Sequence, residues 1–233
     1  MELNLKLLSI TIDRNFNGGY GRTMSVKTLA SRSRARPLEQ PERKAALLQT
    51  AIRVFARRGL GGARHTEIAR EAGVSVPTVF FYFPTREALV REVLNEVANF
   101  YEDMTERIHA SNRPAPEVVL AAARAFGDSV VTHPDYACIV LEWSTSIRSE
   151  LWPQYLQFQE KVVGIVAETV RRWRIETGSP RVKDAENDAR VIAVTGYVHA
   201  QMKITHVPQS KIDRFLQTVL YDTLGVEGLN LII

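Results

Sequence analysis

Cysteine is almost missing from this sequence, which holds Cys138 alone among 233 residues. A single cysteine cannot form a disulfide within the chain, and no group of Cys and His has the spacing of a zinc site. Both absences favour a reducing, cytoplasmic environment and a fold without metal or cofactor. No apolar run approaches the roughly 18 residues that a membrane-spanning helix needs, so we expect no contact with a membrane.

Sequence signatures of catalysis are also lacking. The chain has no glycine-rich loop that would hold a phosphate, no nucleophile elbow, no His-Glu-x-x-His and no clear carboxylate pair. The segment Gly59-Leu-Gly-Gly62 is interpreted as a turn that ends a helix. These absences predict that the protein is not an enzyme.

The charge of the chain is unevenly distributed. The formal net charge is +4, but residues 24–72 carry eleven Lys and Arg against four Asp and Glu, whereas residues 73–233 carry sixteen against twenty. A basic segment beside a mildly acidic remainder is typical of a nucleic-acid-binding region. On charge alone, a solvated basic helix explains the pattern equally well.

Apolar residues recur every three or four positions after Pro41, while the alternation typical of β-strands is missing. The pattern predicts an all-α protein of about nine helices. We expect them from Pro41 to Gly59 and over 65–72, 76–82, 85–109, 116–132, 135–147, 152–176, 184–205 and 209–224. Residues 1–23 are interpreted as disordered or as a product of the chosen start site, since Met24 is a second possible start.

A helix-turn-helix is predicted between residues 66 and 83. Two helices that cross near a right angle need a small residue at their contact, which Ala69 provides, and a residue that tolerates a positive φ in the turn, which Gly73 provides. Val79 completes the small core. Ser75 is placed to cap the second helix, and Pro77 lies early enough in that helix to break no hydrogen bond.

If Val79 points inward, the helical period turns Pro77, Thr78 and Phe81 outward and places Tyr82 at the flank. Hydroxyl groups there suit phosphates or base edges, and apolar groups suit thymine methyls. The arginines before the first helix form a basic arm suited to a minor groove. The residues predicted to contact DNA are Arg32, Arg34, Arg36, Thr66, Ser75, Val76, Pro77, Thr78, Phe81, Tyr82 and Arg86. Aromatic residues such as those at 80–83 more often belong to a core. The prediction of DNA binding therefore depends on the helix corner, the basic arm and the uneven charge occurring in the same part of the chain.

The segment from Glu42 to about Phe100 resembles the DNA-binding domain of the TetR family. Phe83-Pro-Thr-Arg-Glu-Ala-Leu89 matches a family element, and residues 54–59, 75–87 and 142–153 are similar to the LuxR/HapR/SmcR group of quorum-sensing master regulators. The resemblance covers residues 32–224, strongly up to Pro153. It implies an Ω-shaped dimer of nine-helix protomers, in which helices one to three bind DNA and the last two helices form the dimer interface. That group carries Asn at the position of Phe81, so the resemblance implies the loss of a base-reading amide here and does not carry over the identity of the operator.

The C-terminal helices have apolar faces with small residues, which predict either a dimer interface or packing within the protomer. The residues assigned to the dimer are Ile192, Gly196, Ala200, Phe215, Leu216 and Val219. A pocket for a small apolar effector is predicted from Phe126, Tyr136, Cys138, Trp143, Trp152, Tyr155 and Phe158, with ordinary core as the alternative. Cys138 is interpreted as a buried small hydrophobe rather than a redox sensor, and a metal at His199 and His206 is not expected.

The sequence therefore predicts three parts: a flexible extension and basic arm over 1–40, a DNA-binding domain over 41–88, and a helical ligand-binding and dimerisation domain over 89–233. The predicted function is that of a cytoplasmic, homodimeric transcription regulator, a repressor or a dual activator and repressor, that binds a pseudo-palindromic operator. The alternative is a helical adaptor that binds proteins, with the basic arm as a solvated tail.

Overall fold

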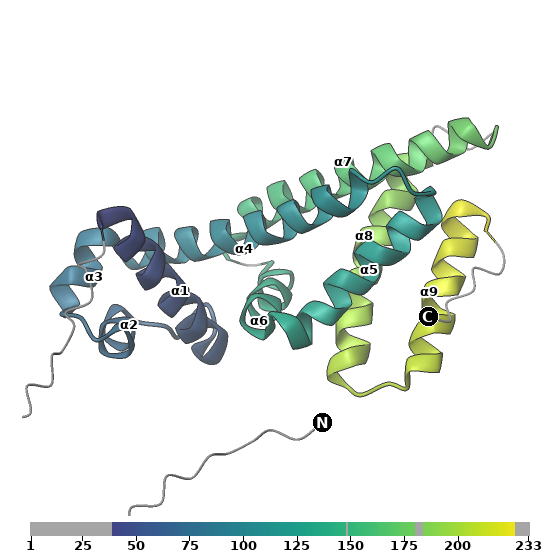
Figure 1. Cartoon of the computed structure of the whole chain (residues 1–233). Coiled ribbons are helices and arrows are strands. Elements are labelled where there is room, and N and C mark those ends of the chain that lie inside the picture. Colours follow the sequence, from purple (N-terminus) through teal and green to yellow (C-terminus); the bar gives the residue numbers. More distant parts are fainter. Residues whose placement is uncertain (1–38, 148, 180–183, 227–233) are drawn as a thin grey trace, which may run out of the picture. The chain divides into compact units, whose positions relative to one another are not determined.

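The computed structural model describes residues 39–147, 149–179 and 184–226. The predicted arm with Arg32, Arg34 and Arg36, together with residues 1–23, lies outside this part of the chain. Within it the regular structure is helical and contains no strand, as predicted (Figure 1). The helices are α1 (Gln40–Arg58), α2 (His65–Ala72), α3 (Val76–Tyr82), α4 (Arg86–His109), α5 (Ala115–Thr132), α6 (Pro134–Trp143), α7 (Trp152–Glu176), α8 (Ala185–Ile204) and α9 (Gln209–Leu224).

Helix α6 is shorter than predicted, because it ends at Trp143 instead of continuing to residue 147. The three hydroxyl residues that follow bind carbonyls of the last turn: Ser144 donates to Leu141, and Thr145 and Ser146 donate to Glu142. Short hydroxyl side chains compete with the helical backbone in this way and favour turns over helix continuation. The periodic apolar residues alone do not reveal that competition.

Helices α1 to α3 pack together, and α1 also contacts α4 and α6. One apolar core runs through this region and includes residues of α1, α2, α3, α4, α6 and the start of α7. Trp143 at the end of α6 is fully buried in it and stacks on Phe158 of α7 at 5.8 Å between ring centroids. The DNA-binding domain predicted over 41–88 thus shares its core with helices of the predicted regulatory part, and the boundary at residue 88 stays a prediction.

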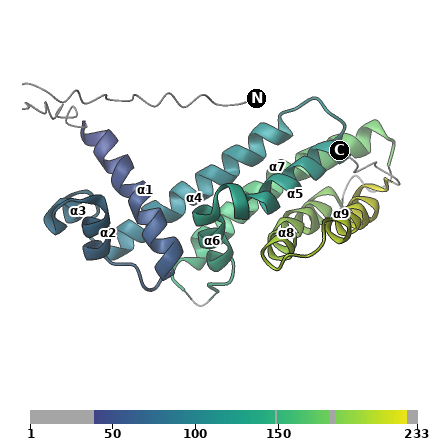
Figure 2. The ribbon, with the colours of Figure 1, turned by 60° about the horizontal axis from the view of Figure 1, so that its bottom comes forward.

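A second apolar core lies among α5, α7, α8 and α9. Helices α8 and α9 run side by side and both contact α5, as Figures 1 and 2 show. Arg174 of α7 is buried where these helices meet and forms an ion pair with Asp188 of α8 while donating to the Thr223 carbonyl of α9. This one guanidinium connects three helices. None of the helices in the described ranges has the length and apolar character needed to cross a membrane.

Candidate nucleic-acid interface

The corner between α2 and α3 is built as its small residues predict. Ala69 and Val79 are buried where the two helices meet, and Gly73 adopts a left-handed conformation with φ of 67°. That conformation is strained for a side chain but open to glycine. The Val74 amide donates to the Ala69 carbonyl at 3.0 Å and closes the turn. The predicted helix-turn-helix geometry is therefore present.

Helix α3 begins with the predicted cap. The Thr78 amide donates to the Ser75 hydroxyl oxygen at 3.3 Å, and the two hydroxyls of these residues lie 2.8 Å apart. Pro77 occupies the first turn, where a missing N–H breaks no helical bond. Ser75 and Thr78 thus fix the start of α3, which would face a DNA groove in this type of motif.

One face of α3 is open to solvent. Phe81 is 69% exposed, Pro77 is exposed, and Thr78 and Tyr82 are half-buried. These four residues line a groove of about 400 Å³ together with Gln40 and Arg43 from the first turn of α1. The outward orientation predicted for the second helix is confirmed. Sequence reasoning missed Gln40 and Arg43, because no local spacing indicates that the start of α1 lies beside α3.

The opposite side of α3 is held against α2 by aromatic packing. The His65 ring stacks on Phe80 at 4.2 Å between centroids, and its Nε2 pairs with the Phe83 carbonyl at 2.8 Å. Val76 is half-buried and packs against the core. Thr66 is exposed in the first turn of α2. The predicted DNA contacts of Thr66, Ser75 and Val76 stay predictions.

Several basic residues of the electropositive segment form ion pairs. Glu71 of α2 pairs with Arg53 and Arg57 of α1, and Glu67 pairs with Arg58. The hydrogen bond from Arg57 lowers the pKa of the Glu71 carboxyl, and the charges of both arginines act in the same direction. Because these pairs join α1 to α2, part of the basic excess serves the fold, while Arg43, Arg64 and Arg70 are exposed.

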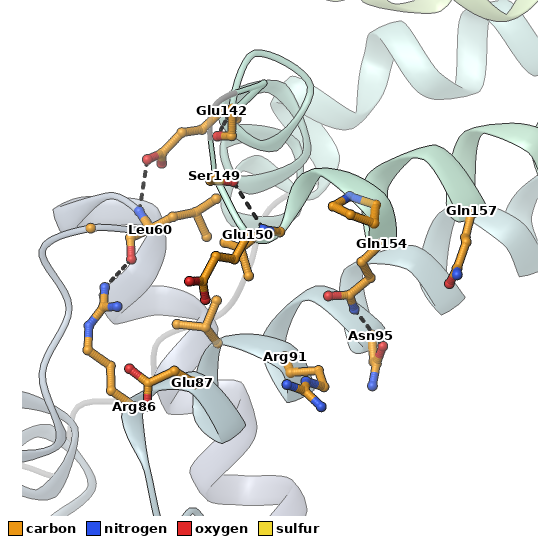
Figure 3. Close-up of a pocket in the computed structure, with 15 residues that line it drawn as sticks. Leu60, Arg86, Glu87, Arg91, Asn95, Glu142, Ser149, Glu150, Gln154 and Gln157 are labelled. Carbon is orange, nitrogen blue, oxygen red and sulfur yellow. Dashed lines mark hydrogen bonds between the residues drawn. The ribbon is translucent and has the colours of Figure 1, made fainter.

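The side chain of Arg86 contacts the protein itself, whereas the sequence predicted a contact with a DNA phosphate. Its guanidinium donates to the Leu60 carbonyl in the turn between α1 and α2, and the residue is half-buried. Figure 3 shows this side chain directed toward Leu60. The predicted phosphate contact of Arg86 stays a prediction, but one that would require the guanidinium to leave or share this bond.

A polar cleft of about 750 Å³ adjoins this turn. Its walls come from the α1–α2 turn, the first half of α4, and the segment from Glu142 to Gln157 (Figure 3). Gln154 donates to Asn95 across the cleft at 2.7 Å. Its charged lining residues are Arg86, Glu87, Arg91, Glu142 and Glu150. This cleft contains none of the seven residues predicted to line an apolar pocket.

The first helices of the chain are similar to those of known proteins. Residues 47–93, from α1 through the corner into α4, match the family model described as "Bacterial regulatory proteins, tetR family". The segment with the helix-turn-helix is thus similar to the DNA-binding region of the TetR family.

An individual relative is similar over a longer part of the chain. The HTH-type transcriptional regulator LuxR of Vibrio harveyi is 42% identical over 136 residues, which cover 56% of this chain and 63% of that protein. The match thus spans less than two thirds of that relative. This identity supports the predicted similarity to the LuxR group.

Solved structures show the same fold at lower identity. A TetR-like transcriptional regulator from Rhodococcus sp. RHA1 has a TM-score of 0.64 at 15% identity and covers 81% of this chain and 100% of that one. A cysteine mutant of the TetR-family regulator CifR, solved with 26-base-pair operator DNA, has a TM-score of 0.64 at 18% identity. The match covers 80% of this chain and 97% of that one.

The apolar pocket predicted from the aromatic residues is filled by their own rings. Trp143, Tyr155 and Phe158 are buried and contact one another, and Trp152 stacks on Tyr155 at 4.9 Å. Phe126 lies elsewhere in the core, between Tyr101 and Tyr197, and Tyr136 accepts from Gln49 at 3.0 Å. The alternative interpretation of these aromatic residues as core is the one that this packing favours.

Cys138 is exposed, so its interpretation as a buried hydrophobe is wrong. Its thiol donates to the Ala56 carbonyl of α1 at 3.3 Å. The apolar neighbours Ala137 and Ile139 are buried because they lie on the inner face of α6, whereas Cys138 lies on the face toward α1. Partial burial, with Glu142 nearby, raises the pKa of this thiol.

The residues assigned to the dimer interface also need correction. Ile192, Ala200 and Leu216 are buried within the protomer, and Gly196 packs on Phe126 of α5. Phe215 and Val219 are partly buried against the same core. These faces of α8 and α9 are covered by α5 and by each other. The exposed large apolar residues of α8 are instead Val191, Val194 and Val198, together with Ile204 at its end.

The two histidines of this region do not converge on a metal. His199 is buried and its Nδ1 pairs with the Ala123 carbonyl at 3.0 Å, whereas His206 is exposed after the end of α8. Across the described ranges, no group of three or more His, Cys, Asp and Glu is arranged to hold a metal ion.

Proposed function

We propose that this protein is a transcription regulator that binds a pseudo-palindromic DNA operator as a homodimer. The observation that carries the proposal is the exposed face of α3 beside the start of α1. Apolar Pro77 and Phe81, the Thr78 and Tyr82 hydroxyls, and the Arg43 guanidinium border one groove. This mixture suits base edges and phosphates together, and the relative LuxR is named as a transcriptional regulator.

In this proposal α3 enters the major groove with Phe81 foremost, while Tyr82, Thr78 and Arg43 contact the backbone. Ser75 and Val76 lie at the leading end of α3, and Thr66 lies at the start of α2. Arg86 is left out of the contact set because its guanidinium is engaged by Leu60. The arm carrying Arg32, Arg34 and Arg36 is assigned to the adjacent minor groove on sequence grounds alone.

The dimer is proposed to form through the outer face of α8. Val191, Val194 and Val198 recur at intervals of three and four and therefore share one face of the helix, and they are 52%, 49% and 37% exposed. A second copy of the chain would cover them and place two α3 helices for the two half-sites of an operator. We place this dimer in the cytoplasm, where its DNA is accessible.

The function is tested by selecting duplexes that the purified protein retains from a random pool, and then measuring affinity over a series of salt concentrations. We expect a pseudo-palindromic consensus and a steep loss of affinity with salt, because phosphate contacts release counterions. Weak binding without sequence preference would favour the adaptor alternative.

A small apolar effector remains a prediction of the sequence. Because Trp143, Trp152, Tyr155 and Phe158 fill their own space, a ligand among them would have to displace these rings. Titration of candidate compounds into the operator complex tests whether any of them releases DNA.

A further inference from the structure

Two of the backbone groups that α1 leaves unsatisfied at its end are the Ala56 carbonyl and the Leu60 amide. The last backbone hydrogen bond of α1 runs from the Gly59 amide to the Phe55 carbonyl at 2.8 Å. The next bond would join the Leu60 amide to the Ala56 carbonyl, but Gly59, with φ of 76°, turns the chain away. Such terminal groups require other partners, particularly at a buried residue such as Leu60.

Helix α6 provides a partner for each of these two groups. The Leu60 amide donates to Glu142 Oε1 at 2.9 Å, and the Cys138 thiol donates to the Ala56 carbonyl at 3.3 Å. Cys138 and Glu142 are four residues apart and therefore lie on one face of α6. The side chains of α6 thus take the place of the hydrogen bond that α1 would have formed by continuing.

The remaining polar group of Leu60 is held from α4. Its carbonyl accepts from the Arg86 guanidinium, so one peptide segment is fixed by a carboxylate on one side and a cation on the other (Figure 3). A side chain at Gly59 would crowd this carboxylate, because a Cβ atom there would lie 3.1 Å from Glu142 Oε1. We name this arrangement of Glu142, Leu60 and Arg86 the Leu60 clamp.

The Leu60 clamp lies between the helices assigned to DNA and the remainder of the protomer. Helices α2 and α3 follow directly after Leu60 in the chain, and α2 packs on α1. A displacement of Leu60 relative to α6 would therefore move α3. In a dimer, both α3 helices must match the spacing of two half-sites, so a small change in their orientation reduces affinity.

We propose that Glu142 is a positioning residue for DNA binding, which acts through Leu60 to fix the orientation of α1, α2 and α3. This inference rests on the proposed function. It assigns an effect on operator affinity to a side chain that the proposed DNA contacts do not include.

The test compares Glu142→Ala and Glu142→Gln with Glu150→Gln, a change in the same wall of the cleft, in the full-length protein. Hydrogen exchange is followed in peptides that cover residues 56–64 and in peptides of α8. In Glu142→Ala we expect exchange near Leu60 to become about tenfold faster, because a charged hydrogen bond is lost, while α8 is unchanged. Glu142→Gln keeps an acceptor oxygen for the Leu60 amide, so exchange near Leu60 should stay close to the wild-type rate.

Operator affinity is then measured on a duplex selected by the wild-type protein. We expect about a tenfold loss for Glu142→Ala, less than a threefold loss for Glu142→Gln, and no change for Glu150→Gln. The slope of log affinity against log salt should stay constant, because no phosphate contact is removed.

Several outcomes would overturn the positioning role. One is faster hydrogen exchange near Leu60 in Glu142→Ala with unaltered operator affinity. Another is a loss of operator affinity in Glu150→Gln as large as that in Glu142→Ala. A lower salt slope would show that the substitution removes phosphate contacts of basic residues, which would contradict a role in orientation alone. If Glu142→Ala does not fold, the test uses Glu142→Gln alone. The positioning role then requires that any loss of operator affinity in this variant is accompanied by faster hydrogen exchange near Leu60. A wild-type protein that selects no duplex would overturn the proposed function itself.

Discussion

At the scale of single side chains, Phe81 is the large apolar residue that α3 exposes most, with 69% of its surface open to solvent. A phenylalanine so exposed contributes little to the folded state, because most of the side chain is already in water. Its ring contacts Tyr82 edge-on at 5.0 Å between centroids. The role of Phe81 is therefore expected in recognition and not in stability.

Replacement of Phe81 with Asn should change which operator is bound. We expect the free energy of unfolding to stay within about 0.5 kcal/mol of the wild type, as for other surface changes. Selection from random duplexes with both proteins should give consensus sequences that differ at the base pairs nearest α3. Tyr82→Phe provides the comparison, since loss of a phosphate contact weakens binding to all sequences alike. Identical consensus sequences for wild type and Phe81→Asn would contradict the assignment.

His109 is a buried histidine at the end of α4. Its Nδ1 pairs with the Thr169 hydroxyl at 2.7 Å, and burial, reinforced by the charge of Arg172, lowers its pKa to about 4. In the unfolded chain the pKa of histidine is about 6.5. Between these values the unfolded chain binds a proton that the folded chain excludes.

The free energy of unfolding should therefore fall as the pH drops from about 6.5 to about 4, by at most about 3 kcal/mol from His109. Above pH 6.5 the residue is neutral in both states and adds no pH dependence. Urea unfolding at pH 7.5 and pH 4.5 checks this, with His109→Gln as the variant. We expect the difference between the two pH values to become smaller in the variant, and an unchanged difference would contradict the prediction.

At the scale of elements, the interface between α5 and α8 depends on a glycine. A Cβ atom at Gly127 of α5 would overlap Nδ1 of His199, which is buried against this helix. Gly164 of α7 is also helical, but a Cβ atom there meets nothing within 4 Å among the described residues. The two positions form a matched pair for the same substitution.

Gly127→Ala should destabilise the protein by about 2 kcal/mol or more, because the methyl group overpacks the interface. Gly164→Ala should stabilise it by about 0.5–1 kcal/mol through the higher helix propensity of alanine. Urea unfolding curves of the two variants and the wild type measure both effects. Equal shifts in the two variants would show that the contact with His199 imposes no constraint.

The bounds of α2 and α3 agree with the prediction because Gly73, Ser75 and Pro77 act locally, through backbone conformation and capping. The end of α6 differed because hydroxyl groups after Trp143 bind the last carbonyls. Cys138 was misplaced for another reason: apolar neighbours in the sequence do not show which face of α6 meets α1.

At the scale of the whole molecule, the proposed dimer depends on the outer face of α8. Val191, Val194 and Val198 are exposed, whereas the residues that the sequence assigned to a partner are covered by α5. An apolar strip of this kind is the surface on which a second copy would dock.

Replacement of Val194 with Asp should convert the proposed dimer to monomer, because a carboxylate would be buried opposite its symmetry mate. The protomer should keep its helical content, since Val194 is 49% exposed. Sedimentation measures the mass, and circular dichroism measures the helix content. Affinity for a palindromic duplex should fall by more than tenfold as the second half-site contact is lost. A wild-type protein that sediments as a monomer, or a Val194→Asp variant that stays dimeric, would contradict the proposal.

The sequence by itself determined the helical class, most helix bounds and the exposed face of α3. Each of these follows from interactions between residues a few positions apart, which a periodic pattern records. Tertiary structure alone decided which faces of α8 and α9 are covered, that the aromatic residues around Trp143 fill their own space, and that Leu60 is held by Glu142 and Arg86. These depend on contacts between residues separated by up to 82 positions, as between Leu60 and Glu142, and no local period encodes them.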